Sequence, residues 1–145
     1  MNSSTNQTSI ATLQQQQEKA AVLMNRFTTL LLEQKREEWL DLFDEKVIFE
    51  FPYVRPADAN RVEGKQALAE HMRYFDTIIA MKSMSEPLIH QTLQPHVFIA
   101  QFQGRGQLLQ TGQVYDQNYI SVIEVKDGRI IRYEDYWNPL AVTVD

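Results

Sequence analysis

The 145-residue chain contains no cysteine. This absence excludes disulfides, thiolate metal ligands and a cysteine nucleophile, and it fits a reducing compartment. The N-terminal residues have neither the basic nor the apolar region of a signal peptide, and no apolar run is long enough to span a bilayer. We therefore expect a cytoplasmic protein that makes no contact with membranes.

Basic residues and histidines are also sparse. The chain has 14 Lys and Arg against 19 Asp and Glu, for a net charge of -5, and its basic residues form no cluster. Nucleic acid is therefore excluded as the main partner, because binding to phosphates requires clustered cations. The three histidines are too scattered to indicate a metal site. Phosphate-loop, dinucleotide-binding, serine-hydrolase and zinc-protease motifs are absent, so we expect no cofactor.

The composition is that of a globular protein, with 43% hydrophobic and 23% charged residues. We expect a single domain over residues 1–145, with residues 1–9 as a flexible lead-in. Apolar residues at helical spacing predict helices over 10–35 and 65–80, and the segment 37–43 predicts a short helix between them. Alternation over 46–51 predicts an early strand.

The second half of the chain has the character of a β-sheet. Four apolar runs predict strands over residues 88–93, 96–109, 113–125 and 129–137, separated by turns at Gln94-Pro95, Thr111-Gly112 and Asp127-Gly128. The two glycines of GRG (104–106) lie within a strand and indicate a bulge or bend. These patterns predict an α+β cone, with three N-terminal helices packed on a strongly curved, mainly antiparallel sheet that encloses a ligand cavity.

The last predicted strand, RIIRYEDYW, carries two adjacent acids whose side chains must point to opposite faces. Glu134 alternates with Arg132, as on an outer face, whereas Asp135 alternates with Ile131, Tyr133 and Trp137, which we expect to face inward with it. We therefore expect Asp135 to face inward, where desolvation would raise its pKa into the range of a general acid or base. The alternative is a structural carboxylate that caps a loop or bonds to a tyrosine hydroxyl.

Six further residues are candidates for the same cavity. His71 lies on the apolar stripe of the third predicted helix, where it could exchange protons with Asp135 or serve as a buried structural histidine. Tyr53 follows the first strand and would close the mouth of the cavity or simply pack. Asn118 is unusual on a strand and would bind the ligand or Asp135 if it faced inward, and Tyr115 is a weaker candidate of the same type. Trp137, with Tyr133, would shape the wall.

Several short motifs in the sequence also resemble those of a known protein family. They are EFPY (50–53), VEGK (62–65), GRG (104–106), the Asn118-Tyr119-Ile120 run and DGRIIRYEDYWNP (127–139). Together they resemble the SnoaL-like branch of the NTF2-like superfamily, and within it the phenazine-biosynthesis A/B group. The resemblance implies a homodimer formed through the sheet and an acid near the end of the last strand. Asp135 occupies that position, where the phenazine group carries Glu, and Lys65 stands where that group carries a histidine.

We therefore hypothesise a cofactor-independent acid/base enzyme that acts on a mostly apolar, carbonyl-bearing metabolite. Asp135 and His71 would be catalytic, in an isomerisation, cyclisation, dehydration or condensation. Tyr53, Asn118, Trp137, Tyr115 and Tyr133 would bind the substrate. The alternatives are a non-catalytic ligand-binding or accessory protein on the same fold, and a dimeric interaction module.

Overall fold

The computed structural model describes residues 9–54 and 60–142, so the predicted lead-in lies outside the described residues except for Ser9. Ser9 accepts a hydrogen bond from the Thr12 backbone N–H and caps the first helix. The helices are α1 (Ile10–Leu32), α2 (Arg36–Leu40) and α3 (Lys65–Ile78), followed at the end of the chain by a 3-10 turn, Pro139–Val142. Within the described part of the chain, no helix combines the length and apolarity needed to cross a membrane.

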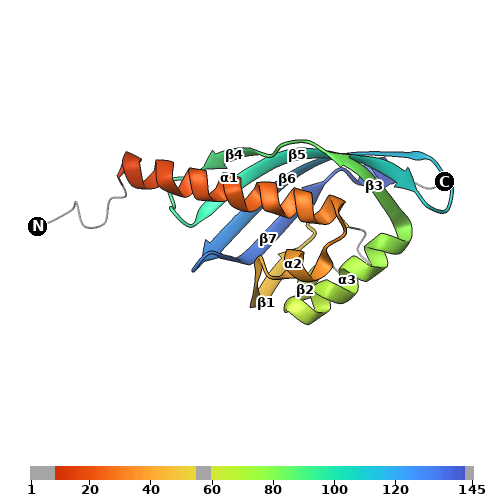
Figure 1. The fold of residues 1–145 in the computed structure, drawn as a ribbon, viewed down its shortest axis with the longest axis horizontal. Coiled ribbons are helices and arrows are strands. Elements are labelled where there is room, and N and C mark those ends of the chain that lie inside the picture. Colours follow the sequence, from red (N-terminus) through yellow and green to blue (C-terminus); the bar gives the residue numbers. More distant parts are fainter. Residues whose placement is uncertain (1–8, 55–59, 143–145) are drawn as a thin grey trace, which may run out of the picture.

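The described residues form seven strands in one curved, mixed sheet, and their three helices lie on one of its faces (Figure 1). The strands are β1 (Phe43–Glu50), β2 (Arg61–Glu63), β3 (Ile79–Met84), β4 (Leu88–Gln91), β5 (Val97–Leu108), β6 (Val114–Lys126) and β7 (Arg129–Trp137). Their order is β2-β1-β7-β6-β5-β3, with β4 also paired to β5. Among the described strands, β1 and β7 form the one parallel pair. The predicted α+β cone is thereby confirmed.

Two strands were not predicted, and both lie next to the predicted third helix. That helix ends at Ile78, and Ile79 already has the extended backbone of β3 (φ -127°, ψ 132°). Ile78-Ile79 is compatible with either state, because β-branched residues favour strands but also complete the apolar stripe of a helix. The pairing of β3 with β5 stabilises the extended backbone at Ile79, so the helix ends at Ile78. The three-residue β2 is too short to produce a pattern in the sequence.

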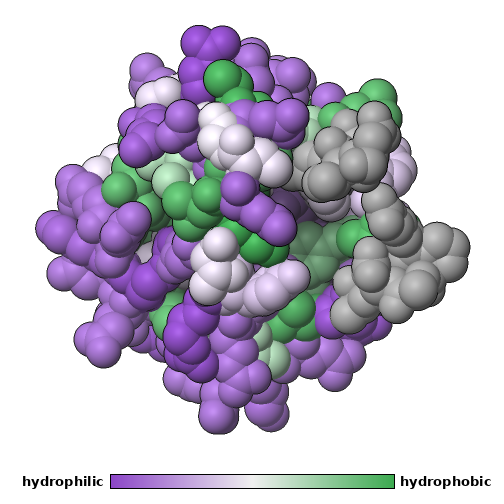
Figure 2. Space-filling view, turned by 90° about the vertical axis from the view of Figure 1, so that its right-hand side faces the viewer, coloured by the Kyte–Doolittle hydropathy of each residue, from purple (hydrophilic) through white to green (hydrophobic). Residues whose placement is uncertain are grey.

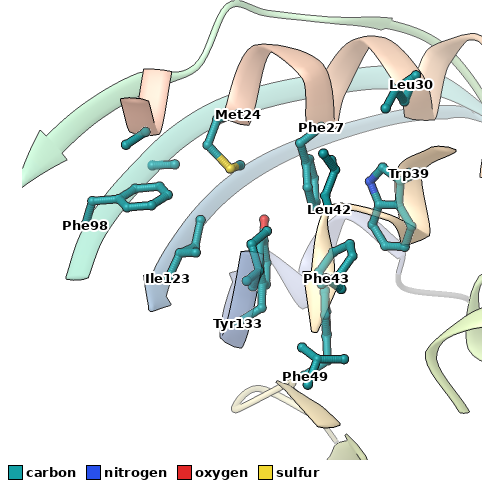
Figure 3. Close-up of a cluster of buried hydrophobic side chains, with 14 of the residues drawn as sticks. Met24, Phe27, Leu30, Trp39, Leu42, Phe43, Phe49, Phe98, Ile123 and Tyr133 are labelled. Carbon is teal, nitrogen blue, oxygen red and sulfur yellow. The ribbon is translucent and has the colours of Figure 1, made fainter. Parts of the chain in front are cut away.

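The hydrophobic core lies between α1 and the inner face of the sheet. Met24, Phe27 and Leu30 of α1 point down onto Tyr133, Phe43 and neighbouring side chains (Figure 3). The Tyr133 ring is stacked almost parallel between Phe27 and Phe49, with centroid separations of 5.3 and 4.5 Å. This packing holds Tyr133 on the inner face of the sheet, and Asp135, two positions later on β7, therefore faces the same way.

The β6–β7 hairpin turns tightly at Asp127-Gly128, as predicted. Both residues have positive φ, 52° and 80°, which is the type I′ geometry. A register shift follows, in which Val125 pairs with Ile130 and Glu124 pairs with Arg132. The shift skips Ile131, so Ile130 is the fully buried residue and the expected inward placement of Ile131 is wrong. Beyond the bulge, Tyr133 and Asp135 follow the predicted alternation.

Candidate functional site

A cavity of about 330 Å³ lies between the helices and the inner face of the sheet. Its volume is within the range of small-molecule sites, about 300–1,000 Å³. The wall is mostly aromatic and aliphatic. The charged residues and imidazole on it are Arg36, His71, Asp76 and Asp135.

Tyr74 and Ile78 of α3 line the cavity and are also exposed to solvent, so the cavity opens beside the C-terminal half of this helix. At the end of the molecule that carries α3 and β3, hydrophobic surface gathers in the centre and is bordered by hydrophilic residues (Figure 2). An apolar molecule can therefore enter from this end.

Asp135 lines the cavity from the end of β7. Part of the residue is accessible, but Oδ1 is buried and has no hydrogen-bond partner within residues 9–54 and 60–142. Burial among apolar groups disfavours the charged carboxylate and raises the pKa of Asp135 from its ordinary 3.8 to about 7. Among the described residues, we find no hydrogen bond from Oδ1 to a loop or a tyrosine of the kind that the structural alternative requires.

The neighbours of Asp135 on the inner face are aromatic. Tyr133 is 2% exposed, and its hydroxyl accepts a hydrogen bond of 2.9 Å from the Ser121 hydroxyl. Trp137 lines the cavity, and its indole Nε1, like Oδ1 of Asp135, is buried with no hydrogen-bond partner in the parts of the chain that the structure covers. The strand thus presents one unpaired carboxyl oxygen and one unpaired N–H donor among aromatic rings.

His71 reaches the same cavity from α3. Its ring lies 4.7 Å from that of Phe51, and desolvation lowers its pKa. The imidazole is therefore predominantly neutral at pH 7, a state that can accept a proton. Hence the structure brings Asp135 and His71 to one cavity, as the sequence predicted. No hydrogen bond joins the two side chains within the described residues.

Two tyrosines of β6 stand on the inner face beside Asp135. Tyr115 is 2% exposed, Tyr119 is partly exposed, and both line the cavity. Their hydroxyl oxygens are 2.9 Å apart and share a hydrogen bond. Tyr115 was a candidate from the sequence, whereas Tyr119 was not. Counting in steps of two from Tyr115 would have found it.

Two of the predicted substrate-binding residues lie elsewhere. Asn118 is exposed on the opposite face of β6, so its predicted inward placement is wrong. It lies three positions from Tyr115, and a regular strand cannot turn both inward. Tyr53 is 56% exposed and packs edge-to-face on Tyr136, outside the cavity wall, which supports the packing alternative.

Two polar features beneath the site were missed. The amide of Gln117 is fully buried and bonds both the backbone N–H and C=O of Asn138, tying β6 to the end of β7. Arg36 forms a two-pronged ion pair with Asp76 and joins α2 to α3 at the cavity wall. No group of three or more potential metal ligands occurs in the parts of the chain that the structure covers.

Comparison with known proteins places these features in context. Residues 24–133 match the family model described as "SnoaL-like domain". The Bacillus subtilis (strain 168) protein YesE is 40% identical over 119 residues, covering 82% of this chain and 81% of its own. The PhzA/B-like protein PA3332 of Pseudomonas aeruginosa is 36% identical over 102 residues, covering 70% and 72%. A crystal structure of a Bacillus subtilis protein described as a "putative isomerase" has a TM-score of 0.83 and 40% identity, covering 88% and 91%.

Proposed function

The chain belongs to the SnoaL-like domain family, with an NTF2-like fold, and on that premise we propose that its cavity is the active site of a general acid/base enzyme. The resemblance seen in the sequence is confirmed by the domain match and by the PhzA/B-like relative. The reaction is proton transfer at a carbon next to a carbonyl, within an isomerisation, cyclisation, dehydration or condensation. The substrate is a mostly apolar molecule, because the cavity wall is aromatic and aliphatic.

The observation that carries the proposal is the carboxyl group of Asp135. A side chain with a pKa of about 7 is half ionised at neutral pH, so it can both take and return a proton there. Among the described residues, its buried Oδ1 has no hydrogen-bond partner that would hold it in one protonation state. The relative described as a "putative isomerase" supports the same class of chemistry.

His71 is the second group in this scheme. Its neutral imidazole lines the same cavity and can receive a proton at a second position of the substrate or orient it. The hydrophobic wall excludes water and so strengthens each polar interaction inside. Together the two groups allow a proton to leave one carbon and return elsewhere without a cofactor.

A hydrogen–deuterium exchange assay tests this function without the natural substrate. The protein is incubated in D₂O with apolar cyclic ketones such as 2-tetralone, and deuterium next to the carbonyl is measured by mass spectrometry from pH 5 to 9. We expect the catalysed rate to rise through about pH 7 and then level, because the base must be ionised. In parallel, ¹³C NMR of labelled Asp carboxyls should show one titration near 7. An Asp135 carboxyl that titrates near 4, with no exchange, would instead indicate simple ligand binding.

The outer face of the sheet is the second part of the proposal, as the surface of a homodimer. In the described part of the chain the helices cover only the inner face, and Val114 and Ile120 of β6 are 67% and 40% exposed. We expect light scattering to give twice the 16.9 kDa chain mass and the Ile120→Glu variant to give the single mass, because a buried unpaired charge opposes association. A wild-type protein of 16.9 kDa at micromolar concentration would contradict the dimer.

A further inference from the structure

A second hollow lies at the end of the sheet opposite α3, between the N-terminal half of α1, the β4–β5 turn and the β6–β7 hairpin (Figure 1). This hairpin groove has a volume of about 270 Å³, and none of the described residues lines both the groove and the first cavity, which contains Asp135. We propose that the hairpin groove is a separate binding site for a small aliphatic or aromatic carboxylate. The inference does not depend on the acid/base function.

The floor of the hairpin groove is apolar. Ala20 of α1 and Phe98 of β5 are 4% and 2% exposed, and Leu23 and Val125 are partly buried beside them. Phe98 lies at one end of the buried cluster, and Trp39, which lines the first cavity, lies at the other (Figure 3). The volume is just below the range of about 300–1,000 Å³ that is usual for small-molecule sites, so the groove suits a short aliphatic chain or an aromatic ring.

Positive charge gathers at the rim of the hairpin groove. Lys19 of α1 and Lys126 of β6 line the groove, are exposed, and form no ion pair within residues 9–54 and 60–142. Arg129, which pairs with Lys126 across the hairpin, also forms no ion pair in that part of the chain. Asp127 is the one acid among the described lining residues. The rim is therefore locally positive on a chain whose net charge is -5.

The two cations of the hairpin oppose each other directly. Lys126 and Arg129 are paired in the register of β6 and β7, and like charges at such positions destabilise a sheet. An anion bound at the rim offsets this repulsion. Lysine stems also lie along apolar surface while their ammonium groups stay in water. This arrangement matches a ligand whose apolar body lies on the floor and whose carboxylate lies at the rim.

Hydrogen bonds hold the walls of the hairpin groove in place without a ligand. The Gln91 amide closes the β4–β5 turn by donating to the backbone carbonyls of Gln94 and Val97, over 3.1 and 3.2 Å. The backbone N–H of Val125 donates to the carbonyl of His96 over 2.9 Å and ties this turn to β6. A preformed site needs little ordering when its ligand binds, so even a small molecule can bind measurably.

The probes for the hairpin groove are octanoate and octanamide, which share an apolar chain and differ in the charge of the head group. Binding is followed by amide shifts in ¹H–¹⁵N NMR spectra, which report the groove and the first cavity separately. At low ionic strength we expect octanoate to shift the amides of residues 16–23 and 125–129. Octanamide should bind there about 2- to 30-fold more weakly, the effect of losing two exposed ion pairs. High salt should narrow the difference, because it screens exposed charges.

Methionine keeps most of the apolar length of a lysine side chain and removes its charge. Lys19→Met and Lys126→Met should each weaken octanoate binding at the groove about 2- to 5-fold and leave octanamide unchanged. The matched control is Lys46→Met, which removes an exposed lysine of β1 that does not line the groove. This variant should bind octanoate as the wild type does. All three variants should exchange 2-tetralone at the wild-type rate, because none of the three lysines lines the first cavity.

Other results decide against the site. Equal affinities of octanoate and octanamide at the groove would mean that the cations do not recognise the anion. Octanoate that shifts only amides of the first cavity, or none at millimolar concentration, would also overturn the proposal. So would a Lys19→Met, Lys126→Met double variant that keeps the wild-type preference for octanoate. Slower exchange of 2-tetralone in the double variant would contradict the separation of the two sites.

Discussion

Asp135→Asn is expected to abolish ketone exchange and, at pH 8, to make the protein more stable than the wild type. The amide has nearly the shape of the carboxyl group but cannot accept the proton, so the catalysed rate should fall by about 10²- to 10⁴-fold. The exchange assay measures this directly. Glu134→Gln is the matched control, because its carboxylate lies on the outer face in contact with Arg132 and Tyr136.

The effect on stability follows from the raised pKa. The folded chain holds the Asp135 proton up to about pH 7, whereas the unfolded chain releases it near 3.8. Between these values only the folded state binds the proton, so the free energy of unfolding decreases as pH rises and levels off above 7. A shift of this size corresponds to a loss on the order of 4 kcal/mol.

The asparagine variant lacks this titration. Urea denaturation from pH 4 to 9 should therefore give similar stabilities for the two proteins near pH 4 and a growing advantage for Asp135→Asn up to pH 7. Glu134→Gln should not reproduce that pH dependence. A wild-type protein whose stability does not fall between pH 4 and 7 relative to Asp135→Asn would show that the carboxyl is not desolvated.

Asp135 and His71 could be placed from the sequence because each lies on an element with a simple period. His71 shares the stripe of a 14-residue amphipathic helix, and Asp135 follows strict alternation with Tyr133 and Trp137. The alternation is reliable there because the β-bulge lies earlier in the strand, at Ile131. If the alternation were applied from residue 129 onward without the bulge, it would assign the first residues of β7 to the wrong face of the sheet.

The rest of the site depends on contacts that local patterns do not encode. A polar amide on a strand suggested a ligand contact at Asn118, but Gln117 is the buried one, and it ties β6 to the end of β7. The contribution of α2 was missed for a similar reason, since a five-residue helix has no readable stripe, and Arg36 is positioned by its pairing with Asp76 on a distant helix. Contacts between residues so far apart in the sequence can be identified only from the three-dimensional structure.

Gly106→Ala is expected to cost roughly 3 kcal/mol or more of unfolding free energy, as overpacking against rigid backbone does. A Cβ on this residue would lie 2.1 Å from the backbone oxygen of Ala80 and 2.9 Å from Cα of Met81. Both belong to β3, which runs against β5 here with a register shift after Met81. The glycines of the GRG stretch therefore mark a close approach between two strands, with the irregularity on β3.

Gly104→Ala is the matched comparison within the same motif. Its Cβ would press on the flexible end of Met81, 3.0 Å away, and on the Tyr119 ring, which can move by a few tenths of an ångström. We expect a smaller loss of stability, read by urea denaturation of both variants, and equal losses would contradict the backbone argument. Because Met81 and Met84 of β3 line the cavity, the displacement of β3 in Gly106→Ala should also slow the catalysed exchange of 2-tetralone.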